Sequence, residues 1–203
     1  MKHVSLVAIA LLICACGRNE DVTPPDTPAP AGDGPSVAAS TEPETTASAE
    51  AVVTAAVQLS PTQGHTANGG LKITSAGTGV KISGMVQGLP PDSEFGFHFH
   101  EKGDCSAPDA TSAGAHFNPT NQEHGHPQSQ PHHAGDMLNV RSDAQGVAEV
   151  SIDNPDVSLA TGQPNDIVGR ALVLHAKPDD YKTQPSGDSG DRIACGVVAI
   201  QSN

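Results

Sequence analysis

Seven of the ten histidines in this 203-residue chain lie between residues 95 and 136, and Asp136 closes the same segment. Imidazole is the commonest metal ligand in proteins, and a carboxylate is a frequent companion ligand. Residues 95–100, FGFHFH, alternate apolar and polar side chains, which predicts a half-buried strand. His98 and His100 then share one face and form half of a chelate, while Phe97 and Phe99 point to the core.

These histidines, with one later residue, allow two ligand sets. His175 ends a later apolar run and joins His98 and His100, with or without His116, around an open position. Such a nitrogen-rich set suits redox-active copper. A closed set of three imidazoles and one carboxylate suits zinc, and it can be drawn from His116, His124, His133 and Asp136. The two sets share one imidazole if His116 lies between them.

The first residues of the chain predict export. Residues 1–16, MKHVSLVAIALLICAC, combine a basic start with an apolar run at 4–13 that is too short to span a bilayer comfortably. The run ends in a lipobox-like sequence, with Cys16 at the position of the lipidated cysteine. We therefore predict a signal peptide and a lipid anchor to a membrane, hence a periplasmic or cell-envelope lipoprotein. Ordinary cleavage and secretion is the alternative, because Cys14 is unusual in a lipobox.

The remainder of the chain divides by composition. Residues 17–50 are rich in Pro, Ala, Thr, Ser and Glu and predict a disordered acidic linker, and residues 51–203 predict one folded domain. The net charge of −13 argues against a nucleic-acid partner. Cys105 and Cys195 are the two cysteines of the domain, and such a pair in an exported protein predicts a disulfide. It would close a loop of about 90 residues, worth roughly 4 kcal/mol on the chain-entropy model.

Short β-favouring runs between Gly- and Pro-rich turns predict the elements that position these residues. About eight strands and no helix are expected, at residues 51–59, 70–75, 80–87, 94–100, 137–141, 147–152, 167–175 and 195–201. Residues 101–136 and 177–191 remain as two long loops, and loops of that length are usually functional. The predicted fold class is all-β, an eight-stranded antiparallel Greek-key sandwich or flattened barrel.

Several motifs in this order resemble a known family. The chain carries GFHFHEKGD at 96–104, AGAHFNP at 113–119, HAGD at 133–136, LH at 174–175 and GDSGDRIACG at 187–196. Over residues 52–201 they resemble the copper/zinc superoxide dismutase family, in particular its bacterial exported members. The resemblance implies an enzyme that converts two superoxide anions and two protons to dioxygen and hydrogen peroxide by copper redox cycling. It would protect against superoxide outside the cytoplasm.

The resemblance also implies roles for individual residues. The implied copper ligands are His98, His100, His116 and His175, and the implied zinc ligands are His116, His124, His133 and Asp136. His116 would bridge the metals and supply a proton to the forming peroxide. The Cys105–Cys195 disulfide would tie the metal loop to the last strand. Asp179 would link the two sites through His98 and His124, and Arg192 would attract and orient superoxide beside the copper.

Other charged and polar residues receive no such role. His126 and His132 are expected to be solvated, with assistance in metal capture as the alternative, and His65 is expected to be chemically idle. Lys177 and Lys182 are expected to contribute little individually to the field at the site.

The position of Cys105 bears on how the chain would assemble. Cys105 lies only five residues after His100, earlier than in cytosolic eukaryotic members. A homodimer, if formed, would then use an interface unlike the eukaryotic one, and a monomer is the alternative.

The rival functions are a non-catalytic metal-binding or copper-delivery domain and a purely structural surface sandwich. The complete ligand set and Arg192 favour the enzyme over both.

Overall fold

The computed structural model describes residues 52–201. The predicted signal peptide at 1–16, the linker at 17–50 and the lipidation site Cys16 lie outside these residues. The regular elements among these residues are ten strands and one short 3-10 helix: β1 (Thr54–Pro61), β2 (Asn68–Ala76), β3 (Gly79–Gln87), β4 (Glu94–Phe95), β5 (Phe97–His100), η1 (Thr111–Ala113), β6 (Val140–Arg141), β7 (Ala148–Asn154), β8 (Ala171–His175), β9 (Arg192–Val197) and β10 (Ala199–Ile200).

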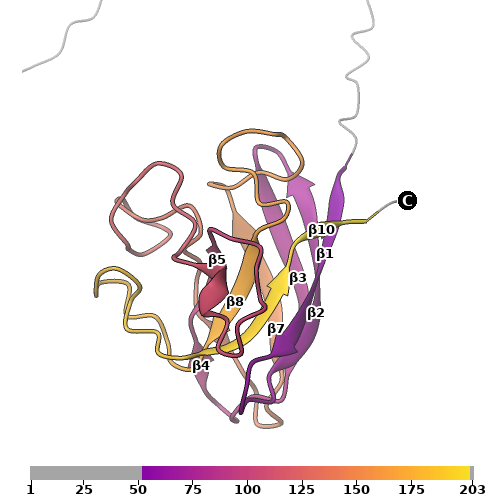
Figure 1. Ribbon diagram of the computed structural model, residues 1–203, viewed down its shortest axis with the longest axis vertical. Helices are drawn as coiled ribbons and strands as arrows, with labels where there is room; N and C mark the ends of the chain where they lie inside the picture. Colours follow the sequence, from indigo (N-terminus) through magenta and orange to yellow (C-terminus); the bar gives the residue numbers. More distant parts are fainter. Residues whose placement is uncertain (1–51, 202–203) are drawn as a thin grey trace, which may run out of the picture. The chain divides into compact units, whose positions relative to one another are not determined.

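The strands form one curled antiparallel sheet and a small two-stranded one (Figure 1). The main sheet has the order β5-β8-β9-β1-β2-β3-β7, with β10 paired to β1, while β4 pairs with β6. The β2–β3 hairpin turns at 76–79, between two of the predicted strands. The all-β fold class is confirmed. No helix among residues 52–201 is long and apolar enough to cross a membrane.

Two predicted strands are each divided in the structure. The run at 94–100 breaks at Gly96, where the chain leaves the β4–β6 pair and joins β8 as β5. Gly96 donates its N–H to the Lys177 carbonyl at 2.8 Å, and a side chain there would lie 3.0 Å from Ser189. This close approach of the second long loop explains the break. The last predicted strand is likewise split into β9 and β10, and β9 begins at Arg192 rather than at Cys195.

A hydrophobic core supports one side of β5. Phe97 and Phe99 are fully buried in the main apolar cluster together with Phe95, Ile73 and Ile82. Burying a side chain of this size contributes about 1.5–3 kcal/mol, so the core holds the strand firmly. The alternation of β5 therefore sends His98 and His100 away from the core, as predicted.

Two long loops lie over that outer side of β5. The first connects β5 to β6 and is joined to β5 by isolated bridges, His98 with Asp136 and His100 with His116. The predicted disulfide is formed, and it joins Cys105 in this loop to Cys195 in β9. The second loop connects β8 to β9. Backbone pairing and a covalent bond thus position loops that contain little regular structure.

Candidate metal centre

Four buried histidines from three parts of the fold converge on one point. His98 and His100 come from β5, His175 ends β8, and His116 lies in the first long loop. One ring nitrogen of each lies within 4.8 Å of the others. His100 Nε2 and His175 Nε2 are 3.4 Å apart. We call these four residues the copper-type cluster, after the metal predicted for them.

A second group of four buried ligands shares His116 with the first. It contains His116, His124, His133 and Asp136, again with one ligand atom of each within 4.8 Å of the others. The Asp136 carboxylate oxygens lie 2.8 Å from His116 Nδ1, 3.0 Å from His124 Nδ1 and 3.3 Å from His133 Nδ1. We call this group the zinc-type cluster. The His116 imidazole therefore lies between the two clusters, as the sequence-based prediction required.

The ring nitrogens that face these clusters test whether metals fit there. Among residues 52–201, four buried side-chain nitrogens have no hydrogen-bond partner: His98 Nδ1, His116 Nε2, His124 Nδ1 and His133 Nδ1. Burying an unpaired polar atom costs about 1–3 kcal/mol, so four in one place need an explanation. The two that approach Asp136 do so outside hydrogen-bond geometry. Nitrogens arranged in this way fit the coordination of two metal ions.

The opposite ring nitrogens are held by the protein. In the copper-type cluster, His100 Nδ1 donates to the Gly114 carbonyl at 2.9 Å and His175 Nδ1 donates to the Gly190 carbonyl at 3.3 Å. A proton held on Nδ1 leaves the Nε2 lone pair free to bind a metal. The backbone therefore sets the tautomer of each ring.

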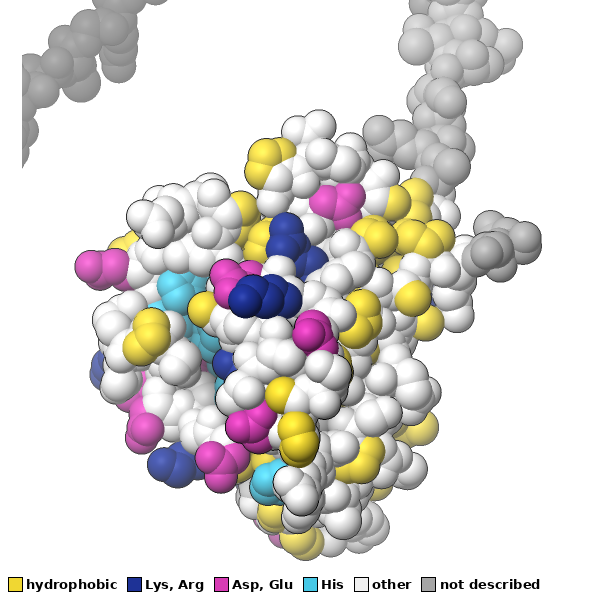
Figure 2. Space-filling model, in the orientation of Figure 1, with side chains coloured by type: hydrophobic (Ala, Val, Ile, Leu, Met, Phe, Trp, Pro, Cys, Tyr) yellow, Lys and Arg dark blue, Asp and Glu magenta, His cyan; other side chains and the backbone are white. Residues whose placement is uncertain are grey.

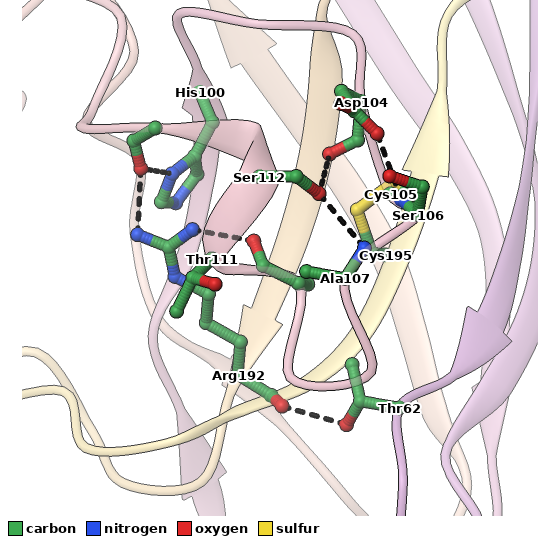
Figure 3. Close-up of a disulfide and its surroundings, with 12 residues drawn as sticks. Thr62, His100, Asp104, Cys105, Ser106, Ala107, Thr111, Ser112, Arg192 and Cys195 are labelled. Atoms are coloured by element: carbon green, nitrogen blue, oxygen red, sulfur yellow. Dashed lines mark hydrogen bonds between the residues drawn. A yellow bond between two sulfur atoms is a disulfide. The ribbon is translucent and has the colours of Figure 1, made fainter.

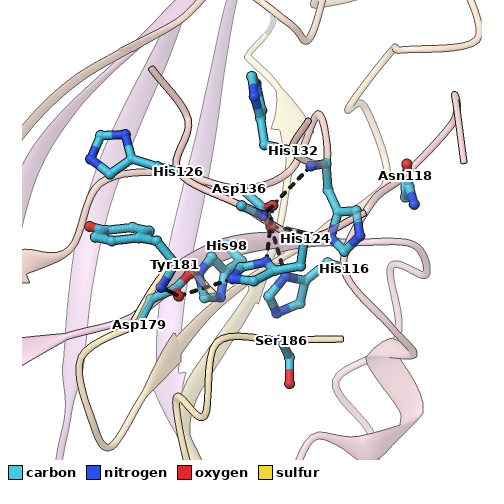
Figure 4. A network of polar contacts seen from close by, with 12 residues as sticks. His98, His116, Asn118, His124, His126, His132, Asp136, Asp179, Tyr181 and Ser186 are labelled. Atoms are coloured by element: carbon cyan, nitrogen blue, oxygen red, sulfur yellow. Dashed lines mark hydrogen bonds and ion pairs between the residues drawn. The ribbon is translucent and has the colours of Figure 1, made fainter. Parts of the chain in front are cut away.

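Asp179 holds one histidine of each cluster. Its Oδ2 accepts from His98 Nε2 at 2.8 Å and its Oδ1 accepts from His124 Nε2 at 3.0 Å (Figure 4). These contacts leave Nδ1 of both rings facing the clusters. Burial favours the neutral acid, but hydrogen bonds from His124, His98 and Tyr181 outweigh it and lower the pKa of Asp179. The carboxylate thus stays ionised as an acceptor between the clusters.

Burial and mutual repulsion keep three histidines of the metal-free copper-type cluster neutral, namely His100, His116 and His175. Burial and the neighbouring His98 lower the pKa of His116 to about 3. Burial and neighbouring histidines also lower the pKa values of His100 and His175 well below their usual range. In the zinc-type cluster, burial alone would lower the pKa of His124, but the carboxylates of Asp136 and Asp179 raise it to about 9. Neutral imidazole is the form that binds metals.

Arg192 lines the cleft that leads to the copper-type cluster. The cleft has a volume of about 900 Å³, and His100, His116 and His175 lie in its wall with Arg192. In Figure 2, histidine side chains are visible inside a hollow on the face shown. The guanidinium donates to the carbonyls of Ala110 and Gly114, each at 2.6 Å (Figure 3). Burial lowers the pKa of Arg192 and Asp109 opposes this effect, so the side chain stays cationic.

The prediction that His132 is solvated is wrong. His132 is buried, donates from Nδ1 to the Ser129 carbonyl, and has Nε2 3.1 Å from Asp156. Its fixed contacts also leave it no free nitrogen for metal capture. His126 is half-buried and packs on the Tyr181 ring, with the ring centroids 4.6 Å apart.

Three other residues considered in the sequence analysis are exposed. His65 is exposed. Lys177 is exposed and lies 3.8 Å from Asp188, and Lys182 is exposed as well. An exposed charge pair of this kind contributes little.

Three residues that the sequence did not single out contact the site or line its cleft. Arg170 lies over the Phe117 ring at 4.1 Å, donates to the Glu101 carbonyl, and lines the cleft. Asn139 and Tyr181 contact Asp179. None of these three side chains is a common metal ligand, and none stands at a spacing typical of a metal site. The one available signal is the position of Asn139, three residues after Asp136.

Comparisons with known proteins are consistent with this geometry. A family model described as copper/zinc superoxide dismutase (SODC) matches residues 67–198, which include both clusters and Arg192. The chain is 44% identical over 133 residues to superoxide dismutase [Cu-Zn] 2 of Aquifex aeolicus, covering 64% of this chain and 78% of that protein. It is 41% identical over 136 residues to the extracellular superoxide dismutase [Cu-Zn] of Haemonchus contortus, covering 64% and 72%.

A solved structure is similar over nearly its whole length. A double mutant of a superoxide dismutase-like protein from Bacillus subtilis aligns with a TM-score of 0.64 at 42% identity, covering 71% of this chain and 96% of that one.

Proposed function

The chain belongs to the copper/zinc superoxide dismutase family, and we propose that it dismutates superoxide by redox cycling of copper outside the cytoplasm. Family membership makes it an oxidoreductase that uses copper and zinc. In the reaction, two superoxide anions and two protons give one dioxygen and one hydrogen peroxide. When bound, copper supplies the one-electron redox chemistry, and zinc supplies a redox-inert charge that orders the loop.

The single observation that carries this proposal is the set of unpartnered ring nitrogens in two clusters joined by His116. His98, His100, His116 and His175 would hold copper, and His116, His124, His133 and Asp136 would hold zinc. Each set combines the ligand types that its metal prefers. The shared imidazole supports a dinuclear centre rather than two independent sites.

Arg192 is the residue that we assign to the substrate. Superoxide is a small anion, and Arg192 is a fixed cation in the wall of the cleft. In a chain of net charge −13, a local positive charge matters more than the total for attracting an anion. Two backbone carbonyls hold the guanidinium, so the side chain loses little conformational entropy when it binds the substrate.

His116 is the residue that we assign to proton delivery. The residue lines the cleft; its Nδ1 lies 2.8 Å from Asp136, whereas its buried Nε2 has no hydrogen-bond partner among residues 52–201. Nε2 is therefore the atom at which this ring can hold a proton for the forming peroxide.

Export and anchoring are part of the proposal. From the sequence we infer a signal peptide at 1–16, a lipid anchor at Cys16 and a tether at 17–50. The Cys105–Cys195 disulfide supports export, because it suits an oxidising compartment. If the protein forms a homodimer, the early position of Cys105 favours an interface unlike the eukaryotic one, and a monomer is the alternative. Mass spectrometry of the mature N-terminus tests the anchor, and an unmodified cysteine there would reject it. Sedimentation of the folded domain tests the dimer, and a monomer at high concentration would reject that inference.

The experiment for the activity combines metal analysis with kinetics. The purified protein, loaded with both metals, should contain one copper and one zinc per chain and should remove superoxide in a cyanide-sensitive way. Free copper at the same concentration, with and without zinc, is the control. Full metal loading with no activity above that control would reject the enzyme and favour a metal-binding or copper-delivery domain.

A further inference from the structure

The Asp179 carboxylate is held by more than the two histidines that it links. Its Oδ1 also accepts from the backbone N–H of Tyr181 at 2.6 Å. Tyr181 has a left-handed backbone conformation, with φ of 58°, and this turn directs its N–H back toward Asp179. Three donors therefore converge on the carboxylate of Asp179, a side chain that is fully buried.

Asn139 pairs with the backbone of Asp179 in both directions. Its Oδ1 accepts from the Asp179 N–H at 2.9 Å, and its Nδ2 donates to the Asp179 carbonyl at 3.0 Å. This two-way pair fixes the backbone from which the carboxylate extends. Asn139 itself lies between Asp136 of the zinc-type cluster and β6, so the pair joins the two long loops.

The Tyr181 hydroxyl closes a ring of contacts. It accepts from the backbone N–H of Asn139 at 2.8 Å, 42 residues away in the chain. Asp179, Asn139 and Tyr181 are thus each bound to the other two. On its outer side the Tyr181 ring packs against His126 (Figure 4).

We propose that Tyr181 and Asn139 are positioning residues that fix the Asp179 carboxylate between the two clusters. A carboxylate can rotate about its side-chain bonds, and either oxygen can serve either histidine. The Asn139 pair holds the backbone, and the Tyr181 N–H holds Oδ1 beside His124, which leaves Oδ2 for His98. The clamp thereby keeps the proton on Nε2 of both rings and Nδ1 directed at the metals.

The inference rests on the proposed function only for the identity of the metals. It predicts that loosening the clamp changes both clusters together, because one carboxylate holds a histidine in each. A residue that merely packs between loops would affect thermal stability without changing either metal site.

The test uses the full chain and two mild substitutions, Tyr181→Phe and Asn139→Leu. Tyr181→Phe removes only the hydroxyl, and Asn139→Leu removes the two-way pair while keeping the branching and the number of side-chain heavy atoms. Zinc affinity is measured by competition with a chromophoric chelator, and the copper site is followed by visible absorption and electron paramagnetic resonance. Each variant should lose about tenfold in zinc affinity, at the low end for outer partners of a ligand. Each should also alter the copper spectrum.

A double-mutant cycle and a matched control sharpen the test. The double variant should lose little more zinc affinity than the single variant with the larger loss, because both residues act through one carboxylate. The control His126→Ala removes the ring that packs on Tyr181 but leaves every hydrogen bond of the clamp, so its zinc affinity should stay within twofold of wild type.

Three results would overturn the inference: zinc affinities near wild type with an unchanged copper spectrum, additive losses in the double variant, or an equal loss in the His126→Ala control. The readouts also separate this inference from the proposed function. A wild-type protein that binds both metals without dismutase activity rejects only the function. An active wild type whose variants bind zinc normally rejects only the clamp.

Discussion

His100 and Arg192 donate to the same backbone oxygen, the carbonyl of Gly114, at 2.9 and 2.6 Å (Figure 3). One carbonyl therefore aligns a ring of the copper-type cluster with the cationic group in the cleft. Gly114 has φ of +78°, and a side chain there would lie 2.4 Å from the Glu101 carboxylate. The disulfide through Cys105 closes the loop that presents this carbonyl. The orientation of the His100 ring and of the Arg192 guanidinium thus depends on the same short segment.

Replacing Arg192 should slow the capture of superoxide. Arg192→Ala should lower kcat/KM by about tenfold or more and weaken its dependence on ionic strength, because the local attraction is lost. Arg192→Lys keeps the charge without the fork of donors and should retain most of the salt dependence. Pulse radiolysis at several salt concentrations measures both. An unchanged rate in Arg192→Ala would remove Arg192 from the substrate path.

Replacing Asp136 should separate the two metals. Asp136 contacts His116, His124 and His133 and belongs to the zinc-type cluster alone. Asp136→Ala should therefore lose zinc before copper when the protein is dialysed against a chelator. Metal content by mass spectrometry measures the order of loss. Equal loss of both metals would contradict the assignment of separate sites.

Reducing the disulfide should destabilise the domain and lower its activity. Cys105 and Cys195 are 90 residues apart, and closing such a loop contributes roughly 4 kcal/mol at most on the chain-entropy model. The enzyme activity should fall when the loop loosens, because the carbonyls of Ala110 and Gly114 that hold the Arg192 guanidinium lie in that loop. Calorimetry with and without reductant, beside a double cysteine-to-serine variant, measures the shift. An unchanged melting temperature would mean that the bond has no structural role.

Gly187 offers a matched pair of substitutions. A side chain at Gly187 would lie 1.8 Å from Asp179 Oδ1 and 2.8 Å from His124 Nε2, whereas one at Gly162 would meet nothing within 4 Å. Their φ values, +68° and +67°, are nearly equal, so Gly187→Ala and Gly162→Ala both carry a backbone cost of about 1–2 kcal/mol. Gly187→Ala alone should also weaken zinc binding, measured by chelator competition. Equal zinc affinities in the two variants would show that the carboxylate can move without consequence.

The metal-free protein should lose stability on acidification. The pKa values of His100, His116 and His175 are lowered in the folded state, that of His116 to about 3, so the unfolded chain binds more protons as the pH falls below about 6.5. The raised pKa of His124, about 9, contributes stability that is fully present at acid pH and is lost only as the pH rises toward 9. The melting temperature of the metal-free protein should therefore fall steadily from pH 6.5 to 4. A flat or rising profile in that range would contradict neutral burial of these rings.

Much of this protein is predictable from local patterns in the chain. The alternation in residues 95–100 assigns His98 and His100 to one face because side chains of a strand alternate. The motifs that follow identify the remaining ligands and Arg192 by type and order. The two cysteines of the domain predict their own bond, which the structure contains. The strand and disulfide inferences need only spacing along the chain or the chemistry of the residue itself, whereas the role of Arg192 depends on the resemblance to the family.

Other properties depend on contacts between distant segments, and only the tertiary structure decides them. His132 looks like a solvated loop residue until Asp156 is placed beside it, 24 residues away. Tyr181 carries no signal in its own surroundings, and Asn139 carries only its closeness to Asp136, yet the two residues bracket Asp179 across 42 residues of chain. The choice of metal-facing nitrogen is likewise tertiary, since it depends on which backbone or carboxylate oxygen meets the opposite side of each ring. The sequence by itself determined which residues can bind metals, and the folded loops decided how each imidazole is turned, because a tautomer is set by a partner that spacing does not reveal.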